Sequence, residues 1–323
     1  MRVEILPDAF TEEGYECLVT LILYFTETRH EWVVDIRHID FVEEYFRRHA
    51  PTRAGIWGDL ARKSQVSGFW APDSSRRPGV QVTRESLADD VHDLGSAARL
   101  VLENGAGDGA FVLAIAHVLG AGRVVAAKER GWLKFVQGGG SGEVPKVARN
   151  EREDFKRTCR VTFLLDSDRM TPGEPSKHEA AVGELRDAGI FGHILCFREI
   201  ENYVPNRVLA AASVPEPRNV PLTERIAHLK VLSHEQRAHF DMKKGFADRR
   251  GQGYEIRPEQ QKLYRSVPES ARVGLRLGFG DGLMQVLLRE AEAGHLKETD
   301  FTALGPDVCD ELRAILDLVQ RIL

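Results

Sequence analysis

Apolar and polar residues follow different patterns along this chain, and the pattern changes near residue 97. From there on, short apolar runs alternate with stretches whose apolar residues recur three and four positions apart. This alternation is typical of a mostly parallel sheet flanked by helices. The predicted strands are 97–103, 123–127, 133–136, 160–165 and 192–197, and the predicted helices between them are 109–119 and 176–188.

The segments on either side of this region have other patterns. The first 95 residues mix helical runs with a short apolar run at 31–36, which predicts an α+β region. Apolar residues recur at helical spacing after residue 211, in 222–232, 282–292 and 308–322. We therefore expect an α/β fold in three parts: an α+β region (1–95), a sheet domain (96–210) and a mainly helical region (211–323). The polar, proline-containing stretch 71–79 is predicted to be an exposed loop.

The composition excludes several classes of protein. The chain has 323 residues, of which 42% are hydrophobic, and a net charge of −5, as in ordinary globular proteins rather than fibrous or disordered ones. Its four cysteines form no CxxC pair, which predicts free thiols in a reducing compartment. No apolar run approaches the roughly 20 residues that cross a bilayer, and the first residues lack a signal pattern. We expect a cytoplasmic protein that does not bind membranes.

Acidic residues follow three of the predicted strands. The carboxyl ends of parallel strands lie at one edge of a sheet, so these side chains are expected to converge. Carboxylates at close range repel one another, and a bound Mg²⁺ or Mn²⁺ relieves that repulsion. The predicted metal ligands are Glu103, Asp108, Asp166, Asp168, Glu199 and Glu201.

The order of these motifs resembles that of the TOPRIM domain. In this chain the order is Glu103 after an apolar strand, a triple glycine at 138–140, and Asp166-x-Asp168 after another strand. The stretches LCFREIENYVP (195–205) and HFDMKKGF (239–246) resemble segments of the overcoming-lysogenization-defect (OLD) type of TOPRIM nucleases and of their stand-alone relatives. The resemblance covers about residues 97–250. It departs from the family's first motif, because Asn104 replaces the usual glycine and Asp108 lies five residues after Glu103.

The resemblance implies a metal-dependent endonuclease that cleaves DNA or RNA. Glu103, Asp166 and Asp168 would be catalytic metal ligands, and Lys244 or Lys243, with a slight preference for Lys244, would stabilise charge on the phosphate. The sequence contains no GxxxxGK[ST] phosphate-binding loop, so any ATPase would be a separate partner subunit. The resemblance further implies a role in bacterial anti-phage defence and allows a homo-oligomer.

A locally basic segment near the end of the resemblance predicts contact with nucleic acid. Residues 243–265 contain seven Lys or Arg and three Asp or Glu, with two tyrosines between them. Nucleic-acid backbones are bound mainly through such positive charge. The predicted contacts are Arg249, Arg250 and Arg257.

Two alternatives remain open from the sequence. The turn ENGAGDG (103–109) also resembles the glycine-rich loop of S-adenosylmethionine-dependent methyltransferases, with Glu129 after the predicted strand 123–127 as the ribose-binding acid. In the second alternative the chain is a non-catalytic subunit, whose TOPRIM fold docks an ATPase or nucleic acid.

Overall fold

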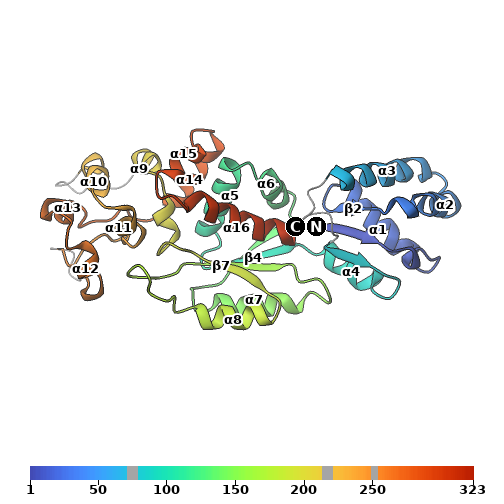
Figure 1. The fold of residues 1–323 in the computed structure, drawn as a ribbon, viewed down its shortest axis with the longest axis horizontal. Coiled ribbons are helices and arrows are strands. Elements are labelled where there is room, and N and C mark those ends of the chain that lie inside the picture. Colours follow the sequence, from blue (N-terminus) through green and yellow to red (C-terminus); the bar gives the residue numbers. More distant parts are fainter. Residues whose placement is uncertain (71–78, 213–220, 249–253) are drawn as a thin grey trace.

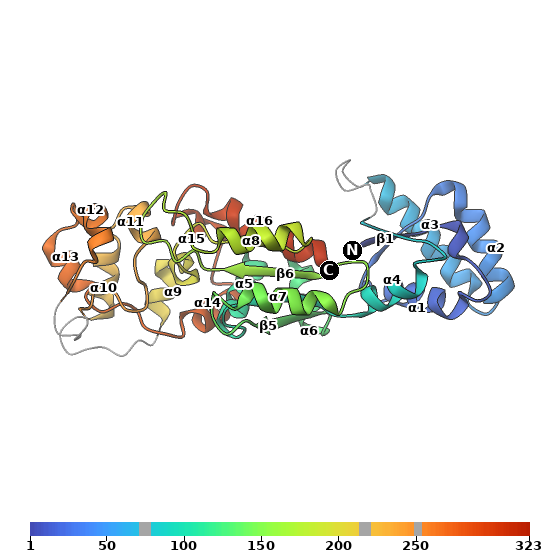
Figure 2. The same ribbon diagram turned by 90° about the horizontal axis from the view of Figure 1, so that it is seen from below.

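The computed structural model describes residues 1–70, 79–212, 221–248 and 254–323, and within it the chain forms two sheets along an elongated molecule (Figure 1). In the described residues both sheets contain only parallel strands. Figures 1 and 2 show a smaller sheet with its helices at one end, a larger sheet in the middle and a group of short helices at the other end. The predicted α/β class is confirmed.

The N-terminal part is a three-stranded sheet with the strand order β2-β1-β3. Its aromatic core includes Phe25 stacked on Trp32, with ring centroids 5.4 Å apart. Helices and strands are mixed here, as the sequence predicted, and all three strands are parallel. The elements are β1 (Arg2–Ile5), α1 (Tyr15–Thr26), β2 (Glu31–Val33), α2 (Ile39–His49), α3 (Ala54–Trp70), β3 (Val80–Val82) and α4 (Leu87–Gly95). Residues 71–78 of the predicted loop lie outside the described residues.

The central sheet has the strand order β5-β4-β6-β7. Successive side chains of a strand point to opposite faces. Leu100 and Leu102 of β4 accordingly belong to the core beneath α5, whereas Val101 belongs to the core beneath α7 and α8. The elements are β4 (Ala98–Leu102), α5 (Gly107–Val118), β5 (Leu133–Gln137), α7 (Val144–Glu153), β6 (Val161–Leu165), α8 (Glu179–Asp187) and β7 (Phe191–Ile194).

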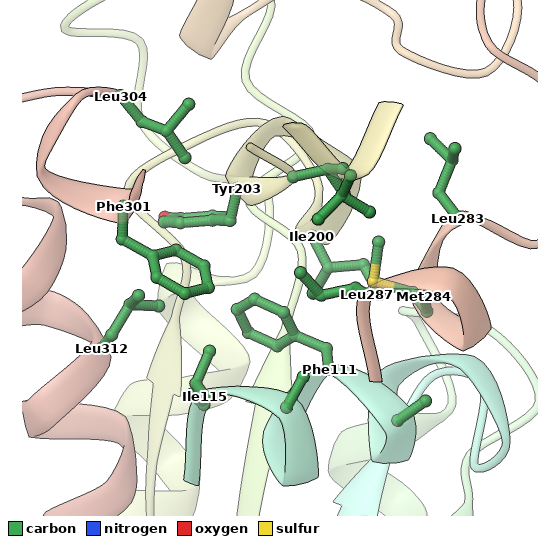
Figure 3. Packing of buried hydrophobic residues seen from close by; sticks show 14 of the residues in the cluster. Phe111, Ile115, Ile200, Tyr203, Leu283, Met284, Leu287, Phe301, Leu304 and Leu312 are labelled. Carbon is green, nitrogen blue, oxygen red and sulfur yellow. The ribbon is translucent and has the colours of Figure 1, made fainter. Parts of the chain in front are cut away.

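The C-terminal helices occupy two different places. Helices α14 (Leu283–Glu292) and α16 (Val308–Ile322) return to the central sheet and pack against α5. Figure 3 shows Phe111 and Ile115 of α5 facing the apolar side chains of these two helices. The remaining helices are α9 (Asn206–Ala211), α10 (Leu222–Leu229), α11 (His234–Ala238), α12 (Gln261–Tyr264), α13 (Glu269–Gly274) and α15 (Glu298–Thr302). Helices α10 to α13 lie at the end of the molecule away from the N-terminal part.

One predicted strand is wrong. Residues 123–127 lie in helix α6 (Gly122–Glu129), whose buried residues Val124 and Ala127 are three positions apart. This is the spacing of a helix face, and the helix packs on α5 and α16. Gly120 and Gly131 have φ values of 73° and 72° and bound the segment on both sides. Helices often end at a glycine in this left-handed conformation.

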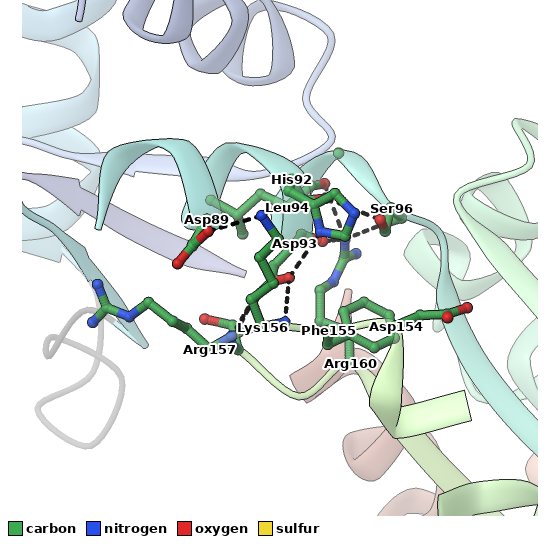
Figure 4. A network of polar contacts seen from close by, with 12 residues as sticks. Asp89, His92, Asp93, Leu94, Ser96, Asp154, Phe155, Lys156, Arg157 and Arg160 are labelled. Atoms are coloured by element: carbon green, nitrogen blue, oxygen red, sulfur yellow. Dashed lines mark hydrogen bonds and ion pairs between the residues drawn. The ribbon is translucent and has the colours of Figure 1, made fainter. Parts of the chain in front are cut away.

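A polar network joins the N-terminal part to the central sheet (Figure 4). The carboxylate of Asp93 accepts backbone N–H groups from Lys156, Arg157 and Thr158 at 2.7 to 2.9 Å. The guanidinium of Arg160 is fully buried and donates to four carbonyl oxygens, three in residues 93–96 and the fourth that of Ile322 in α16. One arginine therefore ties α4 and α16 to the start of β6. Among the described helices, none has the length and apolar character needed to span a membrane.

Candidate active site

Strand order brings the predicted acids to one edge of the central sheet. Strands β4, β6 and β7 are neighbours, and Glu103, Asp166 and Glu199 follow their carboxyl ends. Glu201 lies on a short 3-10 turn (Ile200–Tyr203) two residues further on. The backbone N–H of Ile200 donates to Oδ1 of Asp166 at 3.1 Å, which fixes this turn against the end of β6.

A buried asparagine holds the same turn against the helical part of the chain. The side-chain amide of Asn202 donates to the carbonyl oxygens of Arg237 and Phe240 at 2.7 and 2.9 Å. Its Oδ1 accepts the backbone N–H of Glu199 at 3.1 Å. The segment that carries the predicted lysines is therefore held close to the acidic strand ends.

Lys243, and not Lys244, lies among the carboxylates. Its Nζ is 3.0 Å from Oε1 of Glu201 and 3.7 Å from Oε2 of Glu199. Although burial lowers the pKa of Lys243, the charges of these two glutamates raise it above the ordinary value, so the ammonium stays protonated. The side chain of Lys244 is exposed, and its backbone N–H donates to Asp241. The geometry thus does not support the preference for Lys244.

The carboxyl groups around Lys243 hold their protons more tightly than usual. Burial, followed by the charge of Glu201, raises the pKa of Asp166 well above its ordinary value and that of Glu199 to about 7. Burial raises the pKa of Asp108 to about 6, with the charges of Glu201 and Glu103 as further causes. The pKa of Glu103 is raised by burial and by the charge of a sixth acid, Asp168.

This arrangement fits a divalent cation. In the part of the chain that the structure describes, Lys243 is the cation within 4.0 Å of Glu199 and Glu201, and one lysine does not neutralise a cluster that also contains Glu103, Asp108 and Asp166. Oε2 of Glu201 is buried without a hydrogen-bond partner. A buried carboxylate oxygen that accepts no hydrogen bond costs free energy unless a cation or a proton binds to it. Oxygen ligands of this kind suit Mg²⁺ and Mn²⁺.

Asp168 is turned toward a different set of partners. Its backbone is in the left-handed conformation, with φ of 54°, which aspartate tolerates better than most residues. Its carboxylate lies 2.7 Å from Nζ of Lys177, 3.6 Å from Nε2 of His178 and 3.4 Å from Oγ of Ser141. The backbone N–H of Ser141 also bonds Glu103, so one serine contacts both predicted ligands.

The triple glycine positions that serine. Gly139 and Gly140 have φ values of 80° and 130°, which residues other than glycine rarely adopt. A Cβ on Gly138 would lie 2.5 Å from Val144 and 2.9 Å from the carbonyl oxygen of Leu102. The glycines therefore let the loop after β5 fold over the end of β4. Sequence reasoning found this loop but not Ser141, and it missed Lys177 and His178, which immediately precede α8.

A compact group of metal-ligating atoms occurs elsewhere and was not predicted. In the described part of the chain, the ligand atoms of His193, Cys196 and Glu311 all lie within 4.8 Å of one another, whereas the predicted carboxylates form no comparably compact group. Like-charged carboxylates are expected to stay apart when no cation draws them together. Glu311 is already fully engaged: Oε1 accepts from His193 and from the Cys196 backbone at 2.7 Å each, and Oε2 accepts from Tyr203 at 2.6 Å. These contacts anchor α16 to the end of β7.

A large hollow adjoins Lys243 on the side of the short helices. Its volume is about 920 Å³, and its lining includes Arg198, Lys244 and Arg257 together with several acids. Arg198 is paired with Asp241 at 3.0 Å, and Arg257 lies 3.9 Å from the same carboxylate. Of the predicted nucleic-acid contacts, Arg257 lines this hollow, whereas 249 and 250 lie outside the described residues.

The structure places two of the residues on which the methyltransferase alternative depends. Glu129 is the last residue of helix α6, and so it does not follow a strand. A Cβ on Gly109 would lie 2.4 Å from the ring of Phe135, so this glycine is required where α5 crosses β5. Comparison of the chain with family models, curated proteins and solved structures finds no significant match.

Proposed function

We propose that this protein is a divalent-metal-dependent phosphodiesterase that cleaves nucleic acid, with its active site at the ends of β4, β6 and β7. The observation that carries the proposal is the set of acids around Lys243. Glu103, Asp108, Asp166 and Glu199 all have raised pKa values, and the ammonium of Lys243 contacts Glu199 and Glu201 of this cluster. The motif resemblance to TOPRIM nucleases supports the same assignment.

Glu103, Asp166 and Glu201 are the residues that would hold the metal. Asp108 and Glu199 complete the cluster. Asp168 lies beside it and forms an ion pair with Lys177. A bound Mg²⁺ or Mn²⁺ would supply a Lewis acid and a water of lowered pKa. The chain itself contributes a desolvated acidic site and a protonated lysine at its border.

Lys243 lies where the acids and the hollow meet. Because its ammonium is held by Glu199 and Glu201, it is positioned rather than free to move. A fixed positive charge at this point would stabilise charge that develops on a phosphate during cleavage. Lys244 and Arg257, on the wall of the hollow, would contact backbone phosphates further along the nucleic acid. We further propose, on the resemblance alone, that a separate ATPase subunit controls the activity in anti-phage defence.

The test is cleavage of a mixed panel of DNA and RNA with Mn²⁺, Mg²⁺ or EDTA. Wild type should cleave only with metal, and Asp166→Asn should lose at least about a hundredfold in rate, because a cluster ligand is replaced at nearly constant shape. The lysines form a matched pair: Lys243→Met should be nearly inactive, whereas Lys244→Met should mainly weaken binding.

Full cleavage by Asp166→Asn, or cleavage in EDTA, would refute the proposal. Binding of S-adenosylmethionine without metal would favour a methyltransferase instead. If neither activity is found, and Asp166→Asn retains full biological activity, the chain is a docking subunit.

A further inference from the structure

A second, smaller hollow lies where the N-terminal part meets the central sheet. Its volume is about 260 Å³, and the segments around it are the turn after α1, one face of α6, the start of β5 and the end of α16. Among the described residues, three arginines from two of these segments line it, and no acidic side chain does. The lining residues are Thr28, Arg29, Gly122, Arg123, Ala126, Ala127, Arg130, Trp132 and Leu323.

The three arginines donate their hydrogen bonds to backbone carbonyl oxygens. Arg29 donates to the carbonyl oxygens of Gly95 and Ser96, Arg130 donates to Glu27 O at 3.2 Å, and Arg123 donates to Arg29 O at 3.4 Å. Each of these acceptors is a neutral carbonyl. In the described ranges, no carboxylate oxygen lies within 4.0 Å of a nitrogen of these arginines.

Aromatic rings hold two of the guanidinium groups in place. Arg29 lies over the ring of Tyr24 at 5.0 Å, and Arg130 lies over the ring of Trp132 at 4.9 Å. Cation–π contacts of this kind orient a guanidinium and leave its N–H edge available. The positive charge is thus built into the wall of the hollow.

A fourth, fully buried arginine increases the positive potential. Arg160 shares an acceptor with Arg29, because both donate to the carbonyl oxygen of Ser96, at 2.6 and 2.8 Å. Nη2 of Arg160 is buried without a partner. Burial, and then the charges of Arg29 and Arg123, lower the pKa of Arg160. Burial is also the main cause that lowers the pKa of His30 to about 2, and Arg160 and Arg29 lower it further.

We propose that this hollow binds a small phosphate-bearing anion, such as pyrophosphate or the phosphates of a nucleotide, between the N-terminal part and the central sheet. Several guanidinium groups at one place match a multiply charged anion, and their fork geometry matches phosphate oxygens. The amino end of α6 at Gly122 contributes the positive end of a helix dipole, and the carboxyl end of α16 at Leu323 contributes a negative one, so the guanidinium groups and not the helix ends carry the argument. The hollow has the volume of about nine waters at roughly 30 Å³ each, which suits a small ligand and not a duplex.

The site is separate from the proposed metal centre. The hollow is lined from the N-terminal part, α6, Trp132 just before β5 and the end of α16, whereas the acids follow the carboxyl ends of β4, β6 and β7. An anion bound here would contact both the turn after α1 and α6. It would therefore stabilise the arrangement of the two parts of the chain, and a signal carried by a phosphate compound would act through this junction.

The experiment is calorimetric titration of the full chain with sodium pyrophosphate and with ATP, in EDTA and at constant ionic strength set with chloride. Arg123→Gln and Arg130→Gln should each weaken binding by at least about tenfold, as expected when one charged hydrogen-bonding partner is lost. Both side chains are exposed, so the variants should fold. Circular dichroism spectra like that of wild type are the check on their folding. Arg186→Gln, an exposed arginine on α8, is the matched control and should bind like wild type.

Saturable 1:1 binding that is weakened in both variants and unchanged in Asp166→Asn would support the inference, whether or not the protein proves to be a nuclease. The affinity for pyrophosphate, compared with that for ATP, shows whether the site prefers bare phosphate groups or a nucleotide. Absence of saturable binding, or binding as tight as wild type in both arginine variants, would overturn it.

Discussion

The protonation of Glu199 provides a direct test of the acidic cluster without any assumption about activity. In the folded protein the pKa of Glu199 is raised to about 7 from an ordinary value of 4.5, mainly by burial and then by the charge of Glu201. The side chain is 12% exposed, so solvent screens these effects little. Between pH 4.5 and pH 7 the folded protein therefore binds more protons at this site than the unfolded chain does.

The sign of the effect follows from this difference. The contribution of Glu199 to stability is fully present below pH 4.5, where the side chain is protonated in both the folded and the unfolded state. It is lost as the pH rises from 4.5 through 7, because the folded state holds the ionised carboxylate away from water and the unfolded chain does not. The pKa difference of about 2.5 corresponds to about 3 kcal/mol of unfolding free energy. Glu199→Gln removes this penalty. The amide keeps an oxygen to accept the backbone N–H of Met242, and Lys243 keeps Glu201 at 3.0 Å.

The assay is urea unfolding in EDTA, followed by tryptophan fluorescence, at several pH values from 4.5 to 8. The stability of Glu199→Gln should match wild type near pH 4.5 and exceed it by about 3 kcal/mol at pH 8. Glu153→Gln on α7 is the control, since Glu153 is exposed, and its difference from wild type should stay flat. If Glu199→Gln is no more stable than wild type at pH 8, the carboxylate is compensated within the chain, and the argument that the cluster needs a cation fails.

Two further substitutions test the packing and the junction. Gly109→Ala places a Cβ 2.4 Å from the ring of Phe135 and should lower stability by about 1–3 kcal/mol, whereas Gly183→Ala in α8, where nothing lies within 4 Å, should raise it by about 0.5–1 kcal/mol in the same urea assay. A Gly109→Ala variant as stable as wild type would show that α5 does not approach β5 so closely. Arg160→Met removes four hydrogen bonds to carbonyl groups and should lower stability by at least about 3 kcal/mol, with Arg186→Gln within about 0.5 kcal/mol of wild type. An unchanged midpoint for Arg160→Met would mean that Arg160 does not hold α4 and α16 to β6.

The position of the acids was predictable because it depends on topology alone. Apolar runs identified β4, β6 and β7, and parallel strands place their carboxyl ends at the same edge. Acids that follow those runs must then come together, whatever the details of side-chain packing. The C-terminal apolar stripe was predictable for a similar reason, since residues at helical spacing in 308–322 are buried in α16.

The choice between Lys243 and Lys244 was not predictable, because the two residues are adjacent in a turn without periodicity. The turn is fixed by Asp241, which accepts the backbone N–H groups of Lys244 and Gly245 through its carboxylate and its carbonyl. These bonds turn one lysine toward the acids and the other toward the hollow. The helix at 122–129 was missed because its two adjacent valines favour a strand, while its packing on α5 and α16 is a tertiary contact that local sequence does not contain.

The two acids of the Asp-x-Asp motif have different surroundings for a similar reason. Residues two apart in a strand share a face, but β6 ends at Leu165, and the left-handed backbone of Asp168 ends the alternation. Asp166 therefore lies with Glu201, Glu103 and Asp108, whereas Asp168 pairs with Lys177. Glu103 interacts with both acids, since its charge raises the pKa of Asp166 and the charge of Asp168 raises its own. The motif is thus divided into an inner acid surrounded by other carboxylates and an outer acid paired with Lys177, and the inner one is where a cation is needed.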